Sequence, residues 1–234
     1  MKGRQQFLEG TLVEISWLGH ACFRLRDKNA LIITDPFGKE LGYPPPRVKA
    51  DIVTISNTHP HHSTLDGIKG QPKVLQGPGE YEIQGIFVTG IAFTSEPEAK
   101  GKDKKKESPL RNTIYVFEFD NLTVCHLGGL ALVPTQADVE GLSAIDVLLV
   151  PVGGNTTLDG ASASEVISLL EPRLVIPMHY RTGVQGEPPL DSVERFLRAL
   201  GAKRLQPQEE IKVSRSSLPE ETQVVLLVPK GQAD

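Results

Sequence analysis

Histidines are the residues of this chain that could carry metal chemistry, and they gather at one stretch. The sequence THPHHS at 58–63 follows the apolar run 51–56, which predicts a buried strand ending in a polar turn. His59 and His61 are one residue apart, so two imidazoles can be aimed at one cation. Neutral imidazole is a good zinc ligand, and a catalytic zinc needs three protein ligands and an open position. The stretch therefore predicts a metal site, with a solvent-facing polar loop as the alternative.

The distribution of the histidines favours the metal site. The chain has 6 histidines, and each follows a predicted strand or lies beside a glycine turn: His20, His59, His61, His62, His126 and His179. None lies in the segments that read as helices or in the lysine-rich segment. Histidines without a common role would be scattered over these segments as well.

Composition limits the classes of protein to consider. The chain has 234 residues, of which 39% are hydrophobic and 23% charged, as is typical of one soluble globular domain spanning 1–234. A net charge of −4 argues against a nucleic-acid or membrane-surface protein. No apolar run approaches the roughly 20 residues that span a bilayer, and the N-terminus lacks the apolar core of a signal peptide. Cys22 and Cys125, both in apolar runs, read as packed thiols of a cytoplasmic protein.

The order of predicted elements indicates sheets covered by helices. Alternating or apolar runs predict strands at 12–18, 21–26, 30–34, 51–56, 73–76, 83–89, 113–119, 122–126, 145–151, 174–179, 211–213 and 224–228. Helical spacing predicts helices at 135–142, 162–171 and 190–200, with at most a short helix at 65–69. Strands followed by alternating helices and strands favour sheets with helices on their outer faces.

The segment between Glu96 and Arg111 is rich in lysine and has almost no apolar side chains. It lacks the aromatic residues that stack on bases, and its acidic residues dilute the positive charge. We therefore expect 97–110 to be a mobile, solvated loop rather than a nucleic-acid site.

Several short motifs resemble one known family. They are WLGHA at 17–21, ITDPF at 33–37, THPH at 58–61, GPGEY at 77–81, CHLG at 125–128, VPVGG at 150–154 and IPMHY at 176–180. In this order they resemble the metallo-β-lactamase superfamily, in its branch of small cytoplasmic metal-dependent hydrolases close to ascorbate-6-phosphate lactonase-like proteins. The resemblance implies an α+β fold, a four-layer αββα sandwich of two β-sheets packed face to face, with metals at one edge.

The resemblance also implies a metal site that is largely degraded. The family's metal loop runs His-x-His-x-Asp-His, and its first two places fall on His59 and His61. The remaining ligand positions carry other residues, namely Ser63, Thr64, Ser95 and Gly129. Because His179 is kept, the implied residual ligands are His59, His61 and His179.

Four further residues on or near the matching segments could line the pocket: His20, Asp35, His62 and His126. Each has a simpler interpretation. Asp35 precedes Pro36 and reads as a turn residue, and His126 could pack in the core. His62 in a tight loop is expected to point away from its neighbours.

Three functions remain open at this point. The first is a diverged protein with weak or no hydrolase activity that binds an unknown small molecule or protein. The second is a metal-dependent hydrolase of the lactone or phosphoester type with a remodelled, mononuclear site. The third is a partner-binding domain that uses the lysine-rich segment. The only cofactor expected is one weakly bound zinc or nickel ion, and the sequence does not specify the oligomeric state or the substrate.

Overall fold

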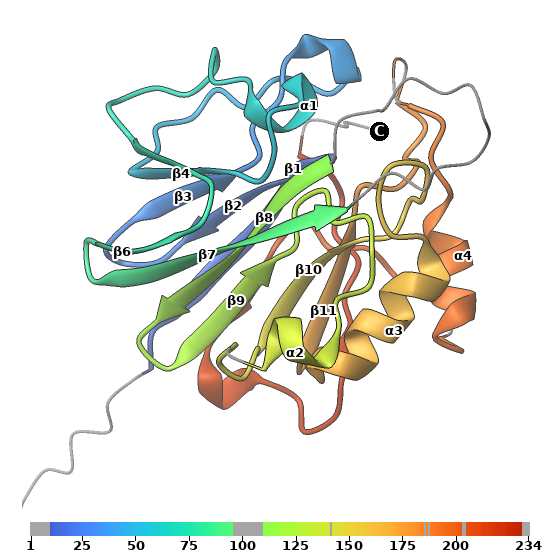
Figure 1. Ribbon diagram of the computed structural model, residues 1–234. Helices are drawn as coiled ribbons and strands as arrows, with labels where there is room; N and C mark the ends of the chain where they lie inside the picture. The colour runs from blue at the N-terminus through green and yellow to red at the C-terminus, as the bar shows by residue number, and fades with distance from the viewer. Residues whose placement is uncertain are drawn as a thin grey trace, which may run out of the picture.

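The computed structural model describes residues 10–95, 110–140, 142–184, 186, 188–202 and 205–230. Within these residues the strands form two sheets that pack face to face (Figure 1). The six-stranded sheet has the order β12 (Ile211–Val213), β1 (Val13–Gly19), β2 (Cys22–Arg26), β3 (Leu31–Thr34), β4 (Ile52–Ile55), β5 (Lys73–Gln76). The seven-stranded sheet has the order β13 (Gln223–Val224), β11 (Leu174–Met178), β10 (Val147–Pro151), β9 (Leu122–His126), β8 (Leu110–Phe119), β7 (Ile86–Ser95), β6 (Gly79–Ile83).

Strand direction brings the ends of several strands to one edge of the sandwich. β2 is antiparallel to both β1 and β3, while β3, β4 and β5 are parallel. The carboxyl ends of β1, β3 and β4 therefore meet at the same edge of the six-stranded sheet. In the other sheet β9, β10 and β11 are parallel. The residues that follow these strands, including most of the histidines, can thus converge.

Alternate residues of the strands bury two different surfaces. Ile32 and Ile52 face the core between the sheets together with Trp17. Their neighbours Ile33 and Val53 join a second cluster on the other face of the same sheet. This second cluster includes residues of the segment around the short 3-10 helix η1 (Lys39–Leu41), namely Phe37, Leu41 and Tyr43. The strands of this sheet are apolar on both faces because both faces are covered.

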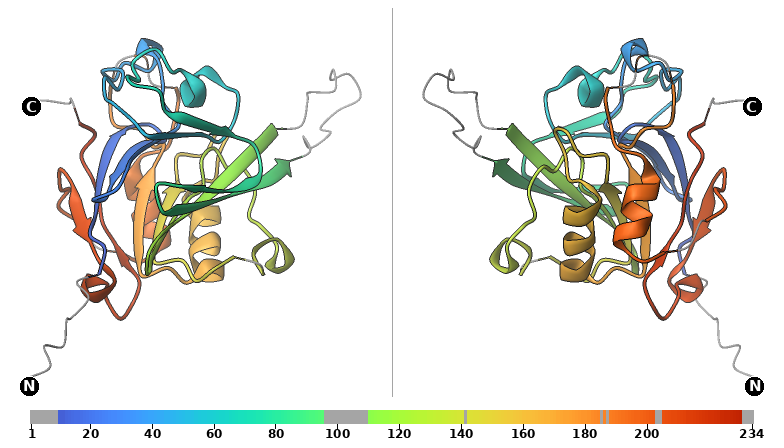
Figure 2. Two further views of the ribbon diagram at one scale, coloured as in Figure 1. Left: turned by 90° about the vertical axis from the view of Figure 1, so that its left-hand side faces the viewer. Right: turned by 90° about the vertical axis from the view of Figure 1, so that its right-hand side faces the viewer.

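Helices cover the outer face of the seven-stranded sheet (Figure 2). α3 (Gly160–Leu170) begins at Asp159, whose side chain accepts hydrogen bonds from two backbone N–H groups of the first turn. Its buried face includes Val166 and Ile167, and it packs against α4 (Val193–Ala199). The helical turn α2 (Gln136–Val139) is closed by a capping box between Thr135 and Asp138.

Tyr115 joins the two sheets near the edge where the strands converge. It lies in β8, and its buried hydroxyl lies 3.2 Å from the carbonyl oxygen of Ile55 and 3.1 Å from that of Leu75. These two residues belong to β4 and β5 of the other sheet. This bond fixes the end of β4 against β8, and with it the start of the histidine stretch.

The structure confirms the predicted αββα sandwich and changes several details. The helix predicted at 190–200 begins at Val193, and that at 135–142 shortens to α2. Residues 65–69 form turns, and the helical turn falls instead at α1 (Pro60–Ser63), inside the histidine stretch. Of the strand predicted at 224–228, only β13 pairs in a ladder. The predicted mobile loop 97–110 lies outside the described residues except for Leu110, the first residue of β8.

The state of the cysteines agrees with the expectation from the sequence. Cys22 and Cys125 are both free and buried, as expected for packed thiols. No helix in the described part of the chain is long and apolar enough to cross a membrane.

Candidate metal centre

Three buried histidines lie together at the edge of the sandwich. His20, His62 and His179 each offer one ring nitrogen, and these three atoms lie within 4.8 Å of one another. The ring centroids of His20 and His179 are 3.9 Å apart, and that of His62 lies 5.1 Å and 5.6 Å from them, respectively. Imidazoles converging at this spacing can bind one transition-metal ion.

Strands from both sheets place two of these histidines. His20 directly follows β1 and His179 directly follows β11, and the backbone N–H of His179 donates a 3.0 Å hydrogen bond to the carbonyl oxygen of His20. Both residues have left-handed backbones, with φ of 52° and 54°. For a residue other than glycine this conformation costs roughly 1–2 kcal/mol. Strained residues of this kind gather at functional sites.

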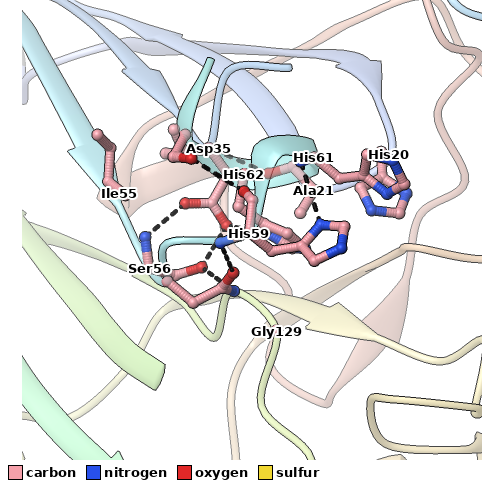
Figure 3. A network of polar contacts seen from close by, with 12 residues as sticks. His20, Ala21, Asp35, Ile55, Ser56, His59, His61, His62 and Gly129 are labelled. Carbon is pink, nitrogen blue, oxygen red and sulfur yellow. Dashed lines mark hydrogen bonds and ion pairs between the residues drawn. The ribbon is translucent and has the colours of Figure 1, made fainter. Parts of the chain in front are cut away.

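Asp35 orients the third histidine. It follows β3 with φ of 40°, is fully buried, and its Oδ2 lies 2.7 Å from Nδ1 of His62. Ser56 completes its hydrogen bonds through its backbone N–H at 2.7 Å and its hydroxyl at 2.5 Å (Figure 3). Because a carboxylate only accepts, Nδ1 of His62 carries the proton. This leaves Nε2 as the nitrogen that can bind a metal, an arrangement found behind many metal-bound histidines.

Burial and neighbouring charge set the protonation states in this cluster. Burial alone would raise the pKa of Asp35, but His62 and the hydrogen bond from Ser56 outweigh it and leave that pKa below its usual value. Burial lowers the pKa of His179 to about 3, and burial with the adjacent histidines holds the pKa of His20 well below its usual value. The cluster therefore combines an ionised carboxylate with the imidazoles of His20 and His179, which burial keeps neutral, the form that binds metal.

Unpaired atoms show that the cluster fits a cation. Nδ1 of His20 and Nδ1 of His179 are buried and have no hydrogen-bond partner among the described residues. A buried polar atom without a partner costs about 1–3 kcal/mol, so such atoms are rare in folded proteins. A divalent ion bound by the imidazoles would remove part of this cost.

His59 and His61 lie on the open side of the cluster. Both line the same cavity as His20 and His179, but His59 is exposed and His61 half-buried. The ring of His61 lies 5.6 Å from that of His20, and the backbone N–H of His61 donates to Nδ1 of His59. The three-histidine cluster thus shares only His179 with the set His59, His61 and His179 predicted from the sequence.

His62 does not point away from its neighbours as expected, because the stretch is helical. Pro60 occupies the first position of α1 and His59 caps it. In a helical turn successive side chains are rotated by roughly 100°. The rotation directs His62 inward to Asp35, next to a more exposed His61 (Figure 3). The signal for this turn was Pro60, directly after a residue able to cap.

The four positions expected to be degraded ligands fall in different places. The hydroxyls of Ser63 and Thr64 donate to backbone carbonyls of the turn before them, at 3.0 Å and 2.7 Å. Ser95 is the last residue of β7, and its side chain lies outside the described part. Gly129 lines the cavity, and a Cβ atom added there would lie 3.5 Å from Cε1 of His62.

His126 packs beneath the cluster, as its simpler interpretation held. Its ring is fully buried, and Nε2 lies 2.8 Å from the carbonyl oxygen of Ala21. This bond fixes the turn that carries His20. Asp35, by contrast, is much more than a turn residue. The sequence placed His126 and Asp35 near the pocket. It did not predict that Asp35, His20 and His62 lie at the centre of the histidine cluster.

The histidines open into one large cavity with a volume of about 1700 Å³. Its walls come from α1, from the ends of β7 and β8, and from the segment that follows β9. This exceeds the roughly 300–1,000 Å³ usual for small-molecule sites, so a substrate of considerable size can reach the histidines.

A two-sheet sandwich with histidines at one edge is the architecture of a β-lactamase-type domain. The family model of the beta-lactamase superfamily domain matches residues 14–179, and the chain belongs to this family. A UPF0173 metal-dependent hydrolase of Pyrococcus horikoshii is 28% identical over 86% of this chain and 100% of its own length. A candidate Zn-dependent hydrolase of the metallo-beta-lactamase superfamily from Thermotoga maritima superposes with a TM-score of 0.75. It is 35% identical over 92% of this chain and 98% of its own.

A more distant structure shows the same fold. A metallo hydrolase from the archaeon Ignicoccus hospitalis has a TM-score of 0.64 at 20% identity, over 87% of this chain and 99% of its own. The relatives are thus named as metal-dependent hydrolases, and the histidine cluster could hold a metal. Together these findings favour the hydrolase hypothesis over the expectation of a protein that has lost its chemistry.

Proposed function

We propose that this protein is a metal-dependent hydrolase with a mononuclear site formed by His20, His62 and His179. The observation that carries the proposal is the convergence of three buried ring nitrogens within 4.8 Å, one of them oriented by a buried carboxylate. Three imidazole ligands would leave a fourth position free, as in a catalytic zinc site. Its substrates are esters of the lactone or phosphoester type.

The position of His62 supports a different register for the metal loop. The spacing His-x-His-x-Asp-His also fits residues 57–62, with His62 in the last place and His59 in the second. Asn57 then stands in the first histidine place and His61 in the aspartate place. In this register Ser63 and Thr64 follow the motif and replace no ligand. Asn57, Ser95 and Gly129 are then the positions where a ligand of a second metal is replaced, because none of them offers an imidazole or a carboxylate.

The residues of the chain have distinct roles in this site. His20 and His179 are neutral through burial and bind the ion, while Asp35 holds His62 with Nε2 toward it. Ser56 holds Asp35 through two hydrogen bonds. When bound, a divalent ion polarises the bond to be cleaved and makes water a stronger acid. Imidazole ligands suit zinc and also nickel, and zinc is the ion we propose first.

Two further features of the chain bear on its compartment and on the kind of substrate. Both cysteines are free, as is usual in a reducing compartment, so we place the protein in the cytoplasm. The net charge of −4 argues against a nucleic acid or a membrane surface as the partner, so we propose a small-molecule substrate. Fractionation of cells that make the protein tests the placement, and recovery outside the cytoplasm would contradict it.

Metal content of the variants tests the proposed site. Tag-free protein, purified without chelator, is expected to contain one zinc or nickel ion by elemental analysis. It should hydrolyse members of a panel of lactones and phosphoesters, and a chelator should abolish the activity. His62→Ala should lose the ion and the activity. Thr156→Ala is the control, because Thr156 is an exposed residue that lines the cavity outside α1 and outside the three-histidine cluster, and it should keep the ion.

Two results would contradict the proposal. One is an ion that stays equally tight in His62→Ala, which would place it elsewhere. The other is native protein without metal and without turnover even after zinc is added, which would restore the hypothesis of a diverged binding protein.

A further inference from the structure

Besides the histidines, one arginine lines the cavity. Arg111 lies in β8, where it pairs with Thr94 of β7. Its side chain is exposed, and neither a hydrogen bond nor an ion pair joins it to another described residue. An arginine with five free donors at a cavity wall is well placed to bind a planar anionic group.

The charges around the cavity leave Arg111 uncompensated. Among the lining residues that the structure describes, Arg111 is the one lysine or arginine and Asp138 the one carboxylate. Asp138 is already engaged, because its Oδ2 accepts hydrogen bonds from the backbone N–H and the hydroxyl of Thr135 at 2.8 Å and 2.7 Å. Arg111 is therefore the lysine or arginine of the described lining that an anion entering the cavity can pair with.

An apolar segment also lines the cavity. The segment 130–134 follows β9 and forms part of the lining. Leu132 in this segment is 57% exposed, which is high for a large aliphatic side chain. An apolar body laid against Leu132 would remove its surface from water, worth about 25 cal/mol for each Å² buried.

We propose that the substrate is an anionic ester or lactone with an apolar body. Its carboxylate or phosphate group pairs with Arg111, and its apolar body lies against segment 130–134, with the scissile bond at the histidines. The reaction class rests on the proposed hydrolysis, in which one water adds across the ester bond to give an acid and an alcohol. The binding of the anion by Arg111 requires only this chain.

Binding to chelator-treated protein tests the anion site apart from the metal. Calorimetry compares phenylacetate with its neutral counterpart phenylacetamide, and phenyl phosphate with phenol. The anion of at least one pair should bind more tightly than its neutral counterpart, and the pair that shows this identifies the preferred group. Arg111→Gln should weaken anion binding about 10- to 100-fold, because a hydrogen bond to a charged group is worth about 1.5–3 kcal/mol. It should leave the neutral compounds unchanged.

Two further variants sharpen the test. Arg111→Lys keeps the charge but not the bidentate geometry, so it should recover part of the affinity. Arg47→Gln removes an exposed arginine outside the cavity and should have no effect. In the metal-loaded enzyme Arg111→Gln should raise KM for an anionic substrate while kcat changes little, since it removes binding common to ground and transition states.

The outcomes separate this inference from the proposed function. Equal binding of anionic and neutral compounds, or full anion affinity in Arg111→Gln, overturns the inference even if metal-dependent hydrolysis is found. Arg111-dependent anion binding in a protein that holds no metal overturns the proposed function and supports the anion site.

Discussion

The contact between Asp35 and His62 carries much of the interpretation at the scale of single residues. A fully buried carboxylate is costly unless it is paired and hydrogen-bonded, and Asp35 has both His62 and Ser56 as partners. Its left-handed backbone adds to that cost. A residue whose burial and backbone conformation both cost free energy, and which lies beside three histidines, indicates a role in orienting the ring of His62 and placing its proton.

Replacing this carboxylate tests that role. Asp35→Asn keeps the shape but no longer requires the proton on Nδ1 of His62, so the metal-binding nitrogen is not fixed. We expect metal affinity to fall about 10- to 100-fold, the usual effect of losing a partner behind a ligand. Competition with a chromogenic chelator measures the change. Ser56→Ala, which removes one hydrogen bond to Asp35, should have a smaller effect. Unchanged affinity in Asp35→Asn would mean that the carboxylate does not act through His62.

Gly129 tests the proposal that the site holds a single ion. No positive φ opposes a side chain at this position, but a Cβ atom would lie 2.8 Å from Nδ2 of Asn57, which donates to Ser56 and would have to shift. Gly129→Asp is therefore combined with Asn57→His, and the pair should raise the bound metal above one ion per chain by elemental analysis. Gly129→Asn in the same background is the uncharged control and should stay at one. Adjacent Gly128 offers no such room, because its Cβ would lie 2.2 Å from that of Ser56.

The sequence predicted the place of the site better than its ligands. It placed His59, His61 and His179 at one edge, and all three line the cavity. It ranked His20 and Asp35 low, because a positive φ at a residue other than glycine leaves no trace in the sequence.

At the scale of elements, the single turn α1 determines which histidine faces inward. Four residues are too few to show helical periodicity, so the stretch read as a loop. The turn is held by Pro60 at its first position and by the ring of His59 as its cap.

Loosening this turn should cost both stability and metal affinity. Pro60→Gly frees the backbone of the unfolded chain, which lowers the free energy of unfolding by about 0.4–1 kcal/mol. It also releases His62 from its preset direction, so metal should bind more weakly. Chemical denaturation and chelator competition measure the two effects. Pro45→Gly, in the extended segment before β4, is the matched control and should alter stability without altering metal affinity. Equal loss of affinity in both variants would rule out a specific role of the turn.

At the scale of the whole molecule, the strand patterns predicted sheets covered by helices, and the resemblance to the family predicted their packing as a sandwich. Alternation and doubly apolar runs marked most of the strands, because each strand buries one or both faces against a neighbouring layer. The residues that cover the outer face of the six-stranded sheet were harder to predict from the sequence. Apolar residues from an irregular segment around η1, such as Phe37 and Tyr43, cover it, and such a segment has no period to detect.

The buried histidines should make the metal-free protein sensitive to mild acid. Burial lowers the pKa of His20, His126 and His179 in the folded state from the ordinary value of 6.5. As the pH falls below 6.5, the unfolded chain binds protons that the folded chain excludes, so the free energy of unfolding decreases. Each such histidine contributes a slope of up to about 1.4 kcal/mol per pH unit. The pKa of Asp35 is lowered from 3.8, so the stability it provides is lost only below that pH.

Urea denaturation of chelator-treated protein between pH 8 and pH 5 measures this dependence. We expect a nearly constant free energy of unfolding above pH 7 and a steady decrease below pH 6.5. His126→Gln removes one buried titrating group that does not belong to the three-histidine cluster. It should reduce the slope of the free energy of unfolding against pH by the contribution of one proton, up to about 1.4 kcal/mol per pH unit. A slope unchanged by this substitution would show that His126 is protonated alike in both states. Zinc-loaded protein should lose stability more steeply still, because protons compete with the ion for His20, His62 and His179.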